Sequence, residues 1–543
     1  MKLGLPSAGK ILFWRKKKPV QKIYLRKVKR GEVVLEMRGI TKRFPGVLAN
    51  DYIDFDIRAG EVHALLGENG AGKTTLMNIM YGLLQPDRGE IYVYGKKVTL
   101  GSPKDAIDLG IGMVHQHFML AEPLTVTENV LLGLKSDRGA FLDIKQAEKR
   151  IIELSKKYGL KVNPKAKIWQ LSVGERQRVE ILKVLYRGAQ VLILDEPTSV
   201  LTPGEVEELS KVLQLMAREG LAVIPFITHK LPEVMAISDR VTVLRKGKVV
   251  GKFKTRRTDK KALARKMVGR EVLFRLPKRR MKREKIVLEV EKLHALSDMG
   301  VPALKGVSFS IHEGEILGIA GVAGNGQHEL AEVIVGLRKA TAGKVLVKKE
   351  DVTNFPPREI IKRSLAYIPE DRIGRGLVMD FSIAENLVLE THADPPFAHK
   401  WFLPFKKQWF INRDEVDKYA EKLMSEFNIM APNKDALARQ LSGGNLQRLI
   451  LARELSREPN ILVAEQPTRG LDVGSTEYIR RRLLEQRGRG AAILLISEDL
   501  DEVMQMSDHI VVMYRGEIVG LIPAAKAKIK EIGLMMAGIK RAS

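Results

Sequence analysis

The amino-acid sequence contains the same series of segments twice. The corresponding residues are 34–37 and 287–290, 57–62 and 311–316, 67–74 and 321–328, 171–175 and 441–445, 191–198 and 461–468, and 226–229 and 495–498. Because their order is preserved, the sequence predicts a duplicated domain. In each half, short apolar runs alternate with longer helical segments, which predicts an α/β domain around a mostly parallel sheet.

A glycine-rich stretch in the first copy fits G-x-x-x-x-G-K-[ST], the phosphate-binding loop of nucleoside triphosphatases. Its residues are Gly67, Glu68, Asn69, Gly70, Ala71, Gly72, Lys73, Thr74 and Thr75. Average composition would give this pattern by chance only about 0.02 times in such a chain. Glycines let backbone N–H groups turn toward an anion, and the helix that begins there adds its positive dipole end. We expect Lys73 to contact the β- and γ-phosphates and the Thr74 hydroxyl to bind Mg²⁺.

Two carboxylates follow a buried-strand pattern in the first copy. The apolar residues 191–194 precede Asp195 and Glu196. Since the carboxyl ends of parallel strands face the ligand crevice, we expect Asp195 to hold Mg²⁺ through water and Glu196 to act as general base. A helix N-cap would explain one of these acids but not both. Gln116 and His229 also end strand-like runs; we expect Gln116 to touch Mg²⁺ and hold the attacking water, and His229 to steady that water.

Each copy also has a helix that opens with serine and glycine. These residues are Ser172 and Gly174 in the first copy, and Ser442, Gly443, Gly444 and Asn445 in the second. Serine with glycine at a helix N-terminus favours anion binding, and Gly443 would let a phosphate approach the backbone. Phe44 is a candidate for stacking on adenine, although a phenylalanine there is also typical of a hydrophobic core.

Composition limits the class of protein. The chain has no cysteine, which excludes disulfides and thiolate metal sites and fits a cytosolic protein. No stretch reaches the ~18 consecutive apolar residues of a membrane span. The formal net charge is +27, and residues 1–30 contain many lysines and arginines but no acid. Two interpretations of these basic segments stand: a solvated tail and linker, or a surface that contacts anionic lipid.

The repeat sets the expected domain boundaries. Residues 1–32 are expected to be a basic N-terminal extension upstream of the first domain-like sequence. The first domain is expected over 33–276, a linker over 277–285, and the second domain over 286–543.

Taken together, these motifs resemble those of ATP-binding cassette (ABC) transporter ATPases over about residues 33–520. The Leu-Ser-x-Gly motif separates this family from other phosphate-loop enzymes, and it occurs twice. More narrowly, the chain resembles the fused two-cassette ATPase subunits of bacterial sugar and nucleoside importers, and residues 113–120, 367–372 and 466–472 resemble the nucleoside-type branch. The resemblance implies two tandem P-loop ABC ATPase domains. Each would have a mostly parallel core sheet, an antiparallel β subdomain and a helical subdomain carrying the signature motif.

The resemblance also implies two unequal composite sites. One would join the first-domain residues Lys73, Asp195, Glu196, Gln116 and His229 to the second-domain signature. In the other, Ser172 and Gly174 would face a loop that keeps Asn325 and Gly326 but has Gln327 for lysine and His328 for threonine. Glu465 and Gln466 replace the acid pair, while Glu370 and Glu498 replace Gln116 and His229. We therefore expect ATP hydrolysis mainly at the first site.

A member of this family would use ATP and Mg²⁺ to energise uptake of a nucleoside or simple sugar. The implied partners are two membrane permease subunits, contacted around residues 117–132 and 371–389, and an extracytoplasmic solute-binding protein; nucleic acid is not expected. The implied location is peripheral, on the cytoplasmic face of the cell membrane.

Two alternatives stay open. A ribose-type monosaccharide importer ATPase is the alternative within the same class. A soluble twin-cassette ribosome-associated ATPase would suit the positive charge, but such factors usually keep both ATP sites intact and carry a long charged helical linker.

Overall fold

A computed structural model of the protein describes residues 28–115, 118–134, 143–198, 201, 203–225, 227–228, 231–271, 278, 285–322, 324–403 and 406–539. The chain divides into a first unit, Met1–Val272, and a second unit, Leu273–Ser543. Lys278, in the segment expected to be a linker, forms an ion pair with Asp508 of the second unit at 3.2 Å. The basic tail expected over residues 1–32 lies outside the described residues up to residue 27.

An antiparallel sheet comes first in each unit. In the first unit its order is β2-β1-β4-β5, and in the second unit β13-β12-β15-β16. The strands are β1 (Val33–Phe44), β2 (Val47–Arg58), β4 (Arg88–Val93) and β5 (Lys96–Val98), then β12 (Ile286–Leu296), β13 (Pro302–His312), β15 (Ala342–Val347) and β16 (Glu350–Asp351). Alternating buried apolar residues, such as Ile53, Phe55 and Ile57, give each sheet one face toward the core.

A mostly parallel sheet follows. In the second unit six strands run in the order β17-β20-β21-β14-β22-β23, and only the last pair is antiparallel. They are β14 (Ile316–Ala320), β17 (Leu365–Ile368), β20 (Ile461–Glu465), β21 (Ala492–Ile496), β22 (His509–Tyr514) and β23 (Glu517–Pro523). Their apolar runs are buried on both faces, as expected for parallel strands covered by helices.

The first unit repeats this strand order in two pieces. One is β6-β7-β8 and the other is β9-β3-β10-β11, and an isolated bridge between Val62 and Val223 links them. The strands are β3 (His63–Gly67), β6 (Ile111–Val114), β7 (Val191–Leu194), β8 (Ala222–Pro225), β9 (Ile227–Thr228), β10 (Arg240–Arg245) and β11 (Lys248–Lys254). The predicted α/β architecture with a mostly parallel core is thus confirmed in both units.

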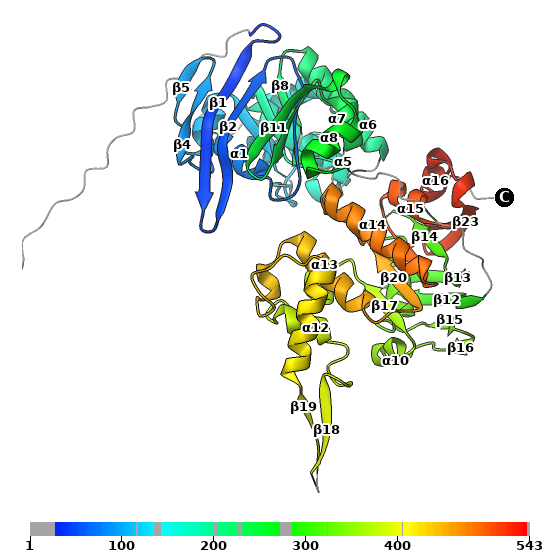
Figure 1. Ribbon diagram of the computed structural model, residues 1–543. Helices are drawn as coiled ribbons and strands as arrows, with labels where there is room; N and C mark the ends of the chain where they lie inside the picture. The colour runs from blue at the N-terminus through cyan, green and yellow to red at the C-terminus, as the bar shows by residue number, and fades with distance from the viewer. Residues whose placement is uncertain are drawn as a thin grey trace, which may run out of the picture. The chain divides into compact units, whose positions relative to one another are not determined.

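Helices surround these sheets (Figure 1). The first unit has α1 (Lys73–Met80), α2 (Pro103–Asp108), α3 (Val126–Leu131), α4 (Ile144–Tyr158), α5 (Val173–Tyr186), α6 (Pro203–Arg218), α7 (Leu231–Ile237) and α8 (Lys260–Val268). The second has α9 (Gln327–Ile334), α10 (Pro357–Lys362), α11 (Ile383–Val388), α12 (Arg413–Glu426), α13 (Gly443–Leu455), α14 (Val473–Gly488), α15 (Leu500–Met506) and α16 (Ile529–Met536). No helix among the described residues is long and apolar enough to cross a membrane.

The expected helical subdomain is α3, α4 and α5 in the first unit, and α11, α12 and α13 in the second. These helices pack on one another within each unit. The second subdomain also carries an antiparallel hairpin, β18 (Ala398–Leu403) and β19 (Lys406–Ile411), which extends outward from the base of α12 in Figure 1.

A histidine on β3 sits in the core beneath the phosphate loop. His63 is fully buried; its Nδ1 lies 2.9 Å from the carbonyl oxygen of Asp56 and its Nε2 lies 2.8 Å from the Thr242 hydroxyl. Since a carbonyl only accepts, Nδ1 carries the proton and the hydroxyl donates to Nε2. Burial lowers the pKa of His63 to about 3, so the ring stays neutral in the folded chain.

This histidine makes the first unit sensitive to acid. The unfolded chain binds a proton on His63 near pH 6.5, while the folded chain does so only near pH 3. Stability is therefore complete above that upper pH and falls as pH decreases, by about 2 kcal/mol on going to about pH 5. The second unit has Leu317 and Val511 at the positions of His63 and Thr242. The double exchange His63→Leu with Thr242→Val should remove this loss.

The measurement is urea unfolding at about pH 5 and about pH 7.5, followed by hydrogen exchange of peptides from each unit. Peptides from the second unit are the internal control. An unchanged pH dependence of the first unit in the double variant would contradict the assignment.

Candidate functional site

The predicted phosphate loop connects the end of β3 to the start of α1. The Lys73 ammonium is buried and donates to the carbonyl oxygens of Gly67 at 2.7 Å and Glu68 at 2.8 Å. Gly72 has φ of 95°, and a Cβ there would lie 2.1 Å from the carbonyl oxygen of Ala49 on β2. No side chain caps α1, so its first N–H groups remain available to an anion.

The predicted acid pair follows β7 directly. The structure brings Asp195 close enough to Lys73 and Glu196 for electrostatic interaction. Burial raises the pKa of Asp195 to about 6; the Glu196 charge adds to the rise and Lys73 opposes it. Within the described residues, no group donates a hydrogen bond to the Asp195 carboxylate. Asp195 is thus a partly buried oxygen ligand beside the loop, available to a cation.

The second loop has almost the same backbone as the first. Gly324 and Gly326 have φ of 84° and 99°, against 78° and 95° for Gly70 and Gly72. The turn bond from Ala71 N–H to Glu68, 3.1 Å, recurs from Asn325 N–H to Val322 at 3.2 Å. No side chain caps α9 either. The duplication has therefore kept the shape of the loop.

The side chains around the second loop differ. The Gln327 amide replaces the Lys73 ammonium and donates to the Val322 carbonyl at 3.2 Å. The imidazole Nδ1 of His328 lies 2.7 Å from Oε1 of Glu465, and the hydroxyl of Tyr367 donates to Oε2 of Glu465 at 2.6 Å. Both oxygens of this buried carboxylate therefore have a partner within the protein.

A second buried carboxylate stands on the other side of His328. Glu332 lies 3.2 Å from Nε2 of His328, accepts from Nε of Arg338 at 2.7 Å and forms an ion pair with Arg375. Hydrogen bonding to Glu465 raises the pKa of His328, against a smaller opposite effect of burial. The environment therefore favours the protonated imidazole.

The two signature helices begin differently. In the first unit the Ser172 hydroxyl accepts from Glu175 N–H at 3.3 Å, and Ser172 N–H donates to the Glu175 carboxylate at 2.9 Å, a capping box. A Cβ on Gly174 would lie 2.4 Å from a carboxylate oxygen of Glu205, so a negative charge is close. In this unit the helix start is occupied by the protein's own groups.

In the second unit the start of α13 is open. The Ser442 hydroxyl caps no backbone N–H of the helix and accepts only from the Asn445 amide at 3.2 Å. Among the described residues, a Cβ on Gly443 would meet nothing closer than Arg372 at 3.9 Å, whereas one on Gly444 would lie 3.1 Å from the Ser475 hydroxyl. The backbone at Gly443 is therefore uncovered on that side, and its contact with a phosphate stays a prediction.

The structure describes some of the remaining predicted site residues and leaves two outside the described residues. Phe44 is exposed at the end of β1, with the Lys42 ammonium 5.8 Å from its ring centre. Glu370 forms an ion pair with Arg469, and Glu498 N–H donates to the Gln466 side chain at 3.2 Å. Gln116 and His229 lie outside the described residues, so their roles stay predictions.

Sequence reasoning missed two residues of these sites. Asn50 is buried on β2, and its amide donates to the carbonyl oxygen of Gly72 at 3.0 Å. Glu332 faces His328 from the same helix, four residues later. Both residues stand among other polar residues of their element, so the sequence contains no signal that these two side chains are buried.

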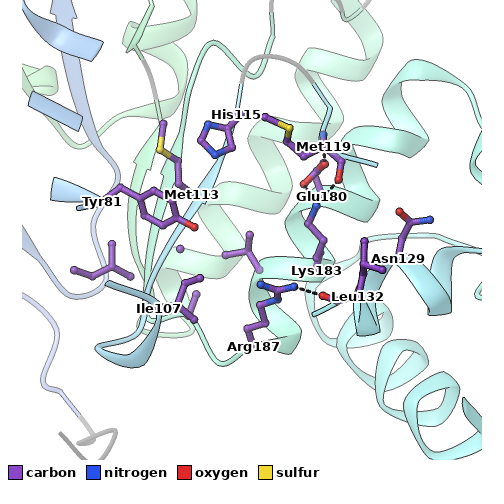
Figure 2. Close-up of a pocket in the computed structure, with 14 residues that line it drawn as sticks. Tyr81, Ile107, Met113, His115, Met119, Asn129, Leu132, Glu180, Lys183 and Arg187 are labelled. Carbon is purple, nitrogen blue, oxygen red and sulfur yellow. Dashed lines mark hydrogen bonds and ion pairs between the residues drawn. The ribbon is translucent and has the colours of Figure 1, made fainter. Parts of the chain in front are cut away.

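A cavity of about 210 Å³ lies between β6 and α5 of the first unit. Figure 2 shows Tyr81 and Met113 on one side, and Glu180, Lys183 and Arg187 of α5 on the other.

Side chains of α5 hold the chain segment at the mouth of this cavity. Met119 N–H donates to Glu180 at 2.6 Å, and the Lys183 ammonium contacts Glu180 and the Met119 carbonyl at 2.8 and 2.9 Å. Arg187 donates to the Leu132 carbonyl at 2.7 Å. The helix that starts at the signature motif is thus hydrogen-bonded to both ends of the segment 119–132 (Figure 2).

Comparisons with known proteins agree with this geometry. The ABC transporter family model matches residues 51–199 and 304–469. The chain is 46% identical over 508 residues to the nucleoside import ATP-binding protein NupA of Lactococcus lactis, covering 94% of this chain and 99% of that one. It is also 46% identical over 537 residues to the glucose import ATP-binding protein TsgD13 of Haloferax volcanii, covering 93% and 96%.

A solved structure supports the fold alone. The archaeal ribosome recycling factor aABCE1, solved with the ribosomal stalk protein aP1, matches with a TM-score of 0.60, 20% identity and 92% coverage of each chain. The relatives that share both sequence and length are import proteins. The chain therefore belongs to the ABC transporter family, as an ATP-hydrolysing subunit with two cassettes in one polypeptide.

Proposed function

We propose that this subunit hydrolyses ATP mainly with the loop of its first unit and the signature helix of its second. One observation supports this most: each unit keeps the residue types for one half of a site. The first unit has the lysine and the acid pair, while its signature helix is capped and has Glu205 beside it. The second unit has an open signature helix, while its loop lacks the lysine.

The residues of the first unit fit the chemistry of ATP hydrolysis. The Lys73 ammonium, held by loop carbonyls, would contact the β- and γ-phosphates. Glu196 would accept a proton from the attacking water, and the predicted partners of that water are Gln116 and His229.

The same unit fits a magnesium ion. Asp195 has a carboxylate without a hydrogen-bonded partner among the described residues, and Thr74 is exposed at the start of α1. These two residues, with Gln116, would hold Mg²⁺, which neutralises phosphate charge in the transition state when bound.

The second half of the active site would come from α13. Ser442, Gly443, Gly444 and Asn445 would offer a hydroxyl, an amide and helix N–H groups to the γ-phosphate. ATP would then draw the two units together, and hydrolysis would release them.

This motion would drive uptake of a nucleoside or a simple sugar through two separate permease subunits, fed by an extracytoplasmic solute-binding protein. Relatives at 46% identity include a nucleoside import protein and a glucose import protein, which supports both solute classes. The subunit would work at the cytoplasmic face of the membrane, where the basic residues 1–30 would contact anionic lipid.

Within the first unit, the cavity beside β6 is the proposed permease contact. The segment 119–132 that lines it falls within the stretch predicted to touch the permease. Glu180, Lys183 and Arg187 of α5 are hydrogen-bonded to this segment. A movement of the signature helix would therefore displace the segment and the permease surface that it contacts.

The first prediction concerns the catalytic groups. Lys73→Ala or Glu196→Gln should lower steady-state ATP turnover by about a hundredfold or more, because a phosphate counter-charge or the general base is lost. The matched changes in the second unit, Gln327→Ala and Gln466→Ala, should alter turnover by less than about twofold. The measurement is phosphate release by the assembled transporter. Near-normal turnover with Glu196→Gln would overturn the assignment of the active site.

The second prediction exchanges the two helix starts. Gly443→Val with Asn445→Glu gives α13 the capping-box sequence of α5, which helps the helix but closes its N-terminus. ATP turnover should fall by about tenfold or more, with no loss of thermal stability. The reciprocal change, Val173→Gly with Glu175→Asn, should leave turnover within about twofold. Equal effects of the two exchanges would contradict the proposed inequality.

The third prediction tests the link to the permease. Lys183→Met keeps the apolar stem but removes both the bond to the Met119 carbonyl and the ion pair with Glu180. Nucleotide binding by the isolated subunit should be unchanged, while solute uptake per ATP hydrolysed in proteoliposomes should fall several-fold. Lys211→Met is the control, because Lys211 is exposed on α6 and pairs only with Glu207 in the described residues. Normal coupling in Lys183→Met would argue against this route.

A further inference from the structure

The second loop keeps the backbone of a phosphate site. Its two left-handed glycines, its turn hydrogen bond and its uncapped helix repeat those of the first loop. A further bond from Gly516 N–H to the Asn325 carbonyl, 3.1 Å, matches the bond from Gly247 N–H to Ala71 at 3.2 Å. A Cβ on Gly324 would meet nothing within 4 Å, so the outer face of the loop is open.

Its side chains do not fit Mg²⁺, which the fold family implies beside such a loop. A magnesium ion needs oxygen ligands, and His328 stands in place of Thr74. The acid in place of Asp195 is Glu465, whose two oxygens already accept from His328 and Tyr367 at 2.7 and 2.6 Å. A magnesium ion would have to displace both donors.

Four residues that differ between the two units are in contact with one another in the second unit. Thr74, Asn78, Met113 and Asp195 of the first unit correspond to His328, Glu332, Tyr367 and Glu465 of the second. The four second-unit side chains bond to one another, with the His328 imidazole between the two buried carboxylates. Both new buried carboxylates, Glu332 and Glu465, thus have partners within the protein. His328 and Glu465 occupy the positions of Thr74 and Asp195, the residues that would bind Mg²⁺ in the first unit.

We propose that the second loop binds the phosphates of a nucleotide without Mg²⁺, through its backbone N–H groups, while the His328 imidazole, whose two ring nitrogens contact Glu465 and Glu332, fills the place of the metal. Arg375, paired with Glu332, adds positive charge to the same cluster. The pKa of His328 is raised by Glu465, which agrees with a cationic ring. This inference rests on the proposed function only in taking the nucleotide to be ATP.

The experiment uses the full chain with Lys73→Ala, so that the first loop contributes little binding. Equilibrium dialysis measures ATP bound per chain with excess Mg²⁺ and with EDTA. We expect one ATP per chain in both, with dissociation constants within about threefold of each other. Adding Gly326→Val should abolish this binding, because a Cβ there would lie 2.5 Å from the Ala303 carbonyl oxygen.

A conversion variant provides the matched control. His328→Thr, Glu332→Asn, Tyr367→Met and Glu465→Asp together give the second unit the side chains of the first. In the Lys73→Ala background this variant should bind ATP at least about tenfold more weakly in EDTA than in Mg²⁺. Its circular dichroism and thermal unfolding show whether it is folded.

Three results would overturn the proposal. They are the absence of ATP binding in the Lys73→Ala chain, a dissociation constant that rises tenfold or more in EDTA, and a stoichiometric Zn²⁺ site lost in His328→Ala. Zn²⁺ is included because ligand atoms of His328, Glu370 and Glu465 lie within 4.8 Å of one another. ATP turnover of the unmodified chain is a separate readout, so failure of the proposed function would be recognised independently.

Discussion

The contact between the phosphate loop and strand β2 is the constraint on which each unit depends. At Gly72 the loop backbone comes so close to Ala49 that a Cβ would lie 2.1 Å from its carbonyl oxygen; at Gly326 the corresponding distance to Ala303 is 2.5 Å. Only glycine fits, both for space and for its positive φ. This contact joins the antiparallel sheet to the parallel core and fixes where α1 and α9 begin. At the loop itself, the two units differ in the side chains placed on this common backbone.

That shared backbone explains how one fold supports two unequal sites. The loop shape comes from glycines and main-chain bonds, which are the same in both units, so losing a lysine does not collapse the loop. The Gln327 amide even keeps the contact of Lys73 with the loop carbonyl, at 3.2 Å in place of 2.8 Å. What changes is charge: an ammonium becomes a neutral amide, and the positive charge moves to His328 and Arg375. The loop backbone can therefore keep its conformation while the charges of the side chains around it change.

Much of the fold and of the first site could be predicted from the sequence, because those features are local. A glycine pattern followed by lysine, or four apolar residues followed by two acids, needs only neighbours in the chain to be interpreted. For the signature helices, Gly443 alone distinguished the second copy in the sequence, and the capping box of Ser172 with Glu175 was found only in the structure.

The network around His328 was not predictable in the same way. Its bond to Glu465 joins residues 137 positions apart. The role of Glu332 can be inferred only from its contacts with His328, Arg338 and Arg375, which the structure brings together. Each exchange alone looks like the loss of a motif residue. Their mutual bonds depend on the meeting of β20, α9 and β17 at one point, which the linear pattern does not contain.

The energetics of this network tie its members to one another. Replacing His328 with threonine alone would leave Glu465 with Tyr367, and Glu332 with Arg338 and Arg375, as remaining partners. Because the His328 side chain is 38% exposed, the cost is below the about 3–5 kcal/mol of breaking a fully buried ion pair. Replacing Glu465 with aspartate alone would shorten the side chain that Tyr367 and His328 both contact. A set of side chains like that of the first unit would therefore require changes at both His328 and Glu465.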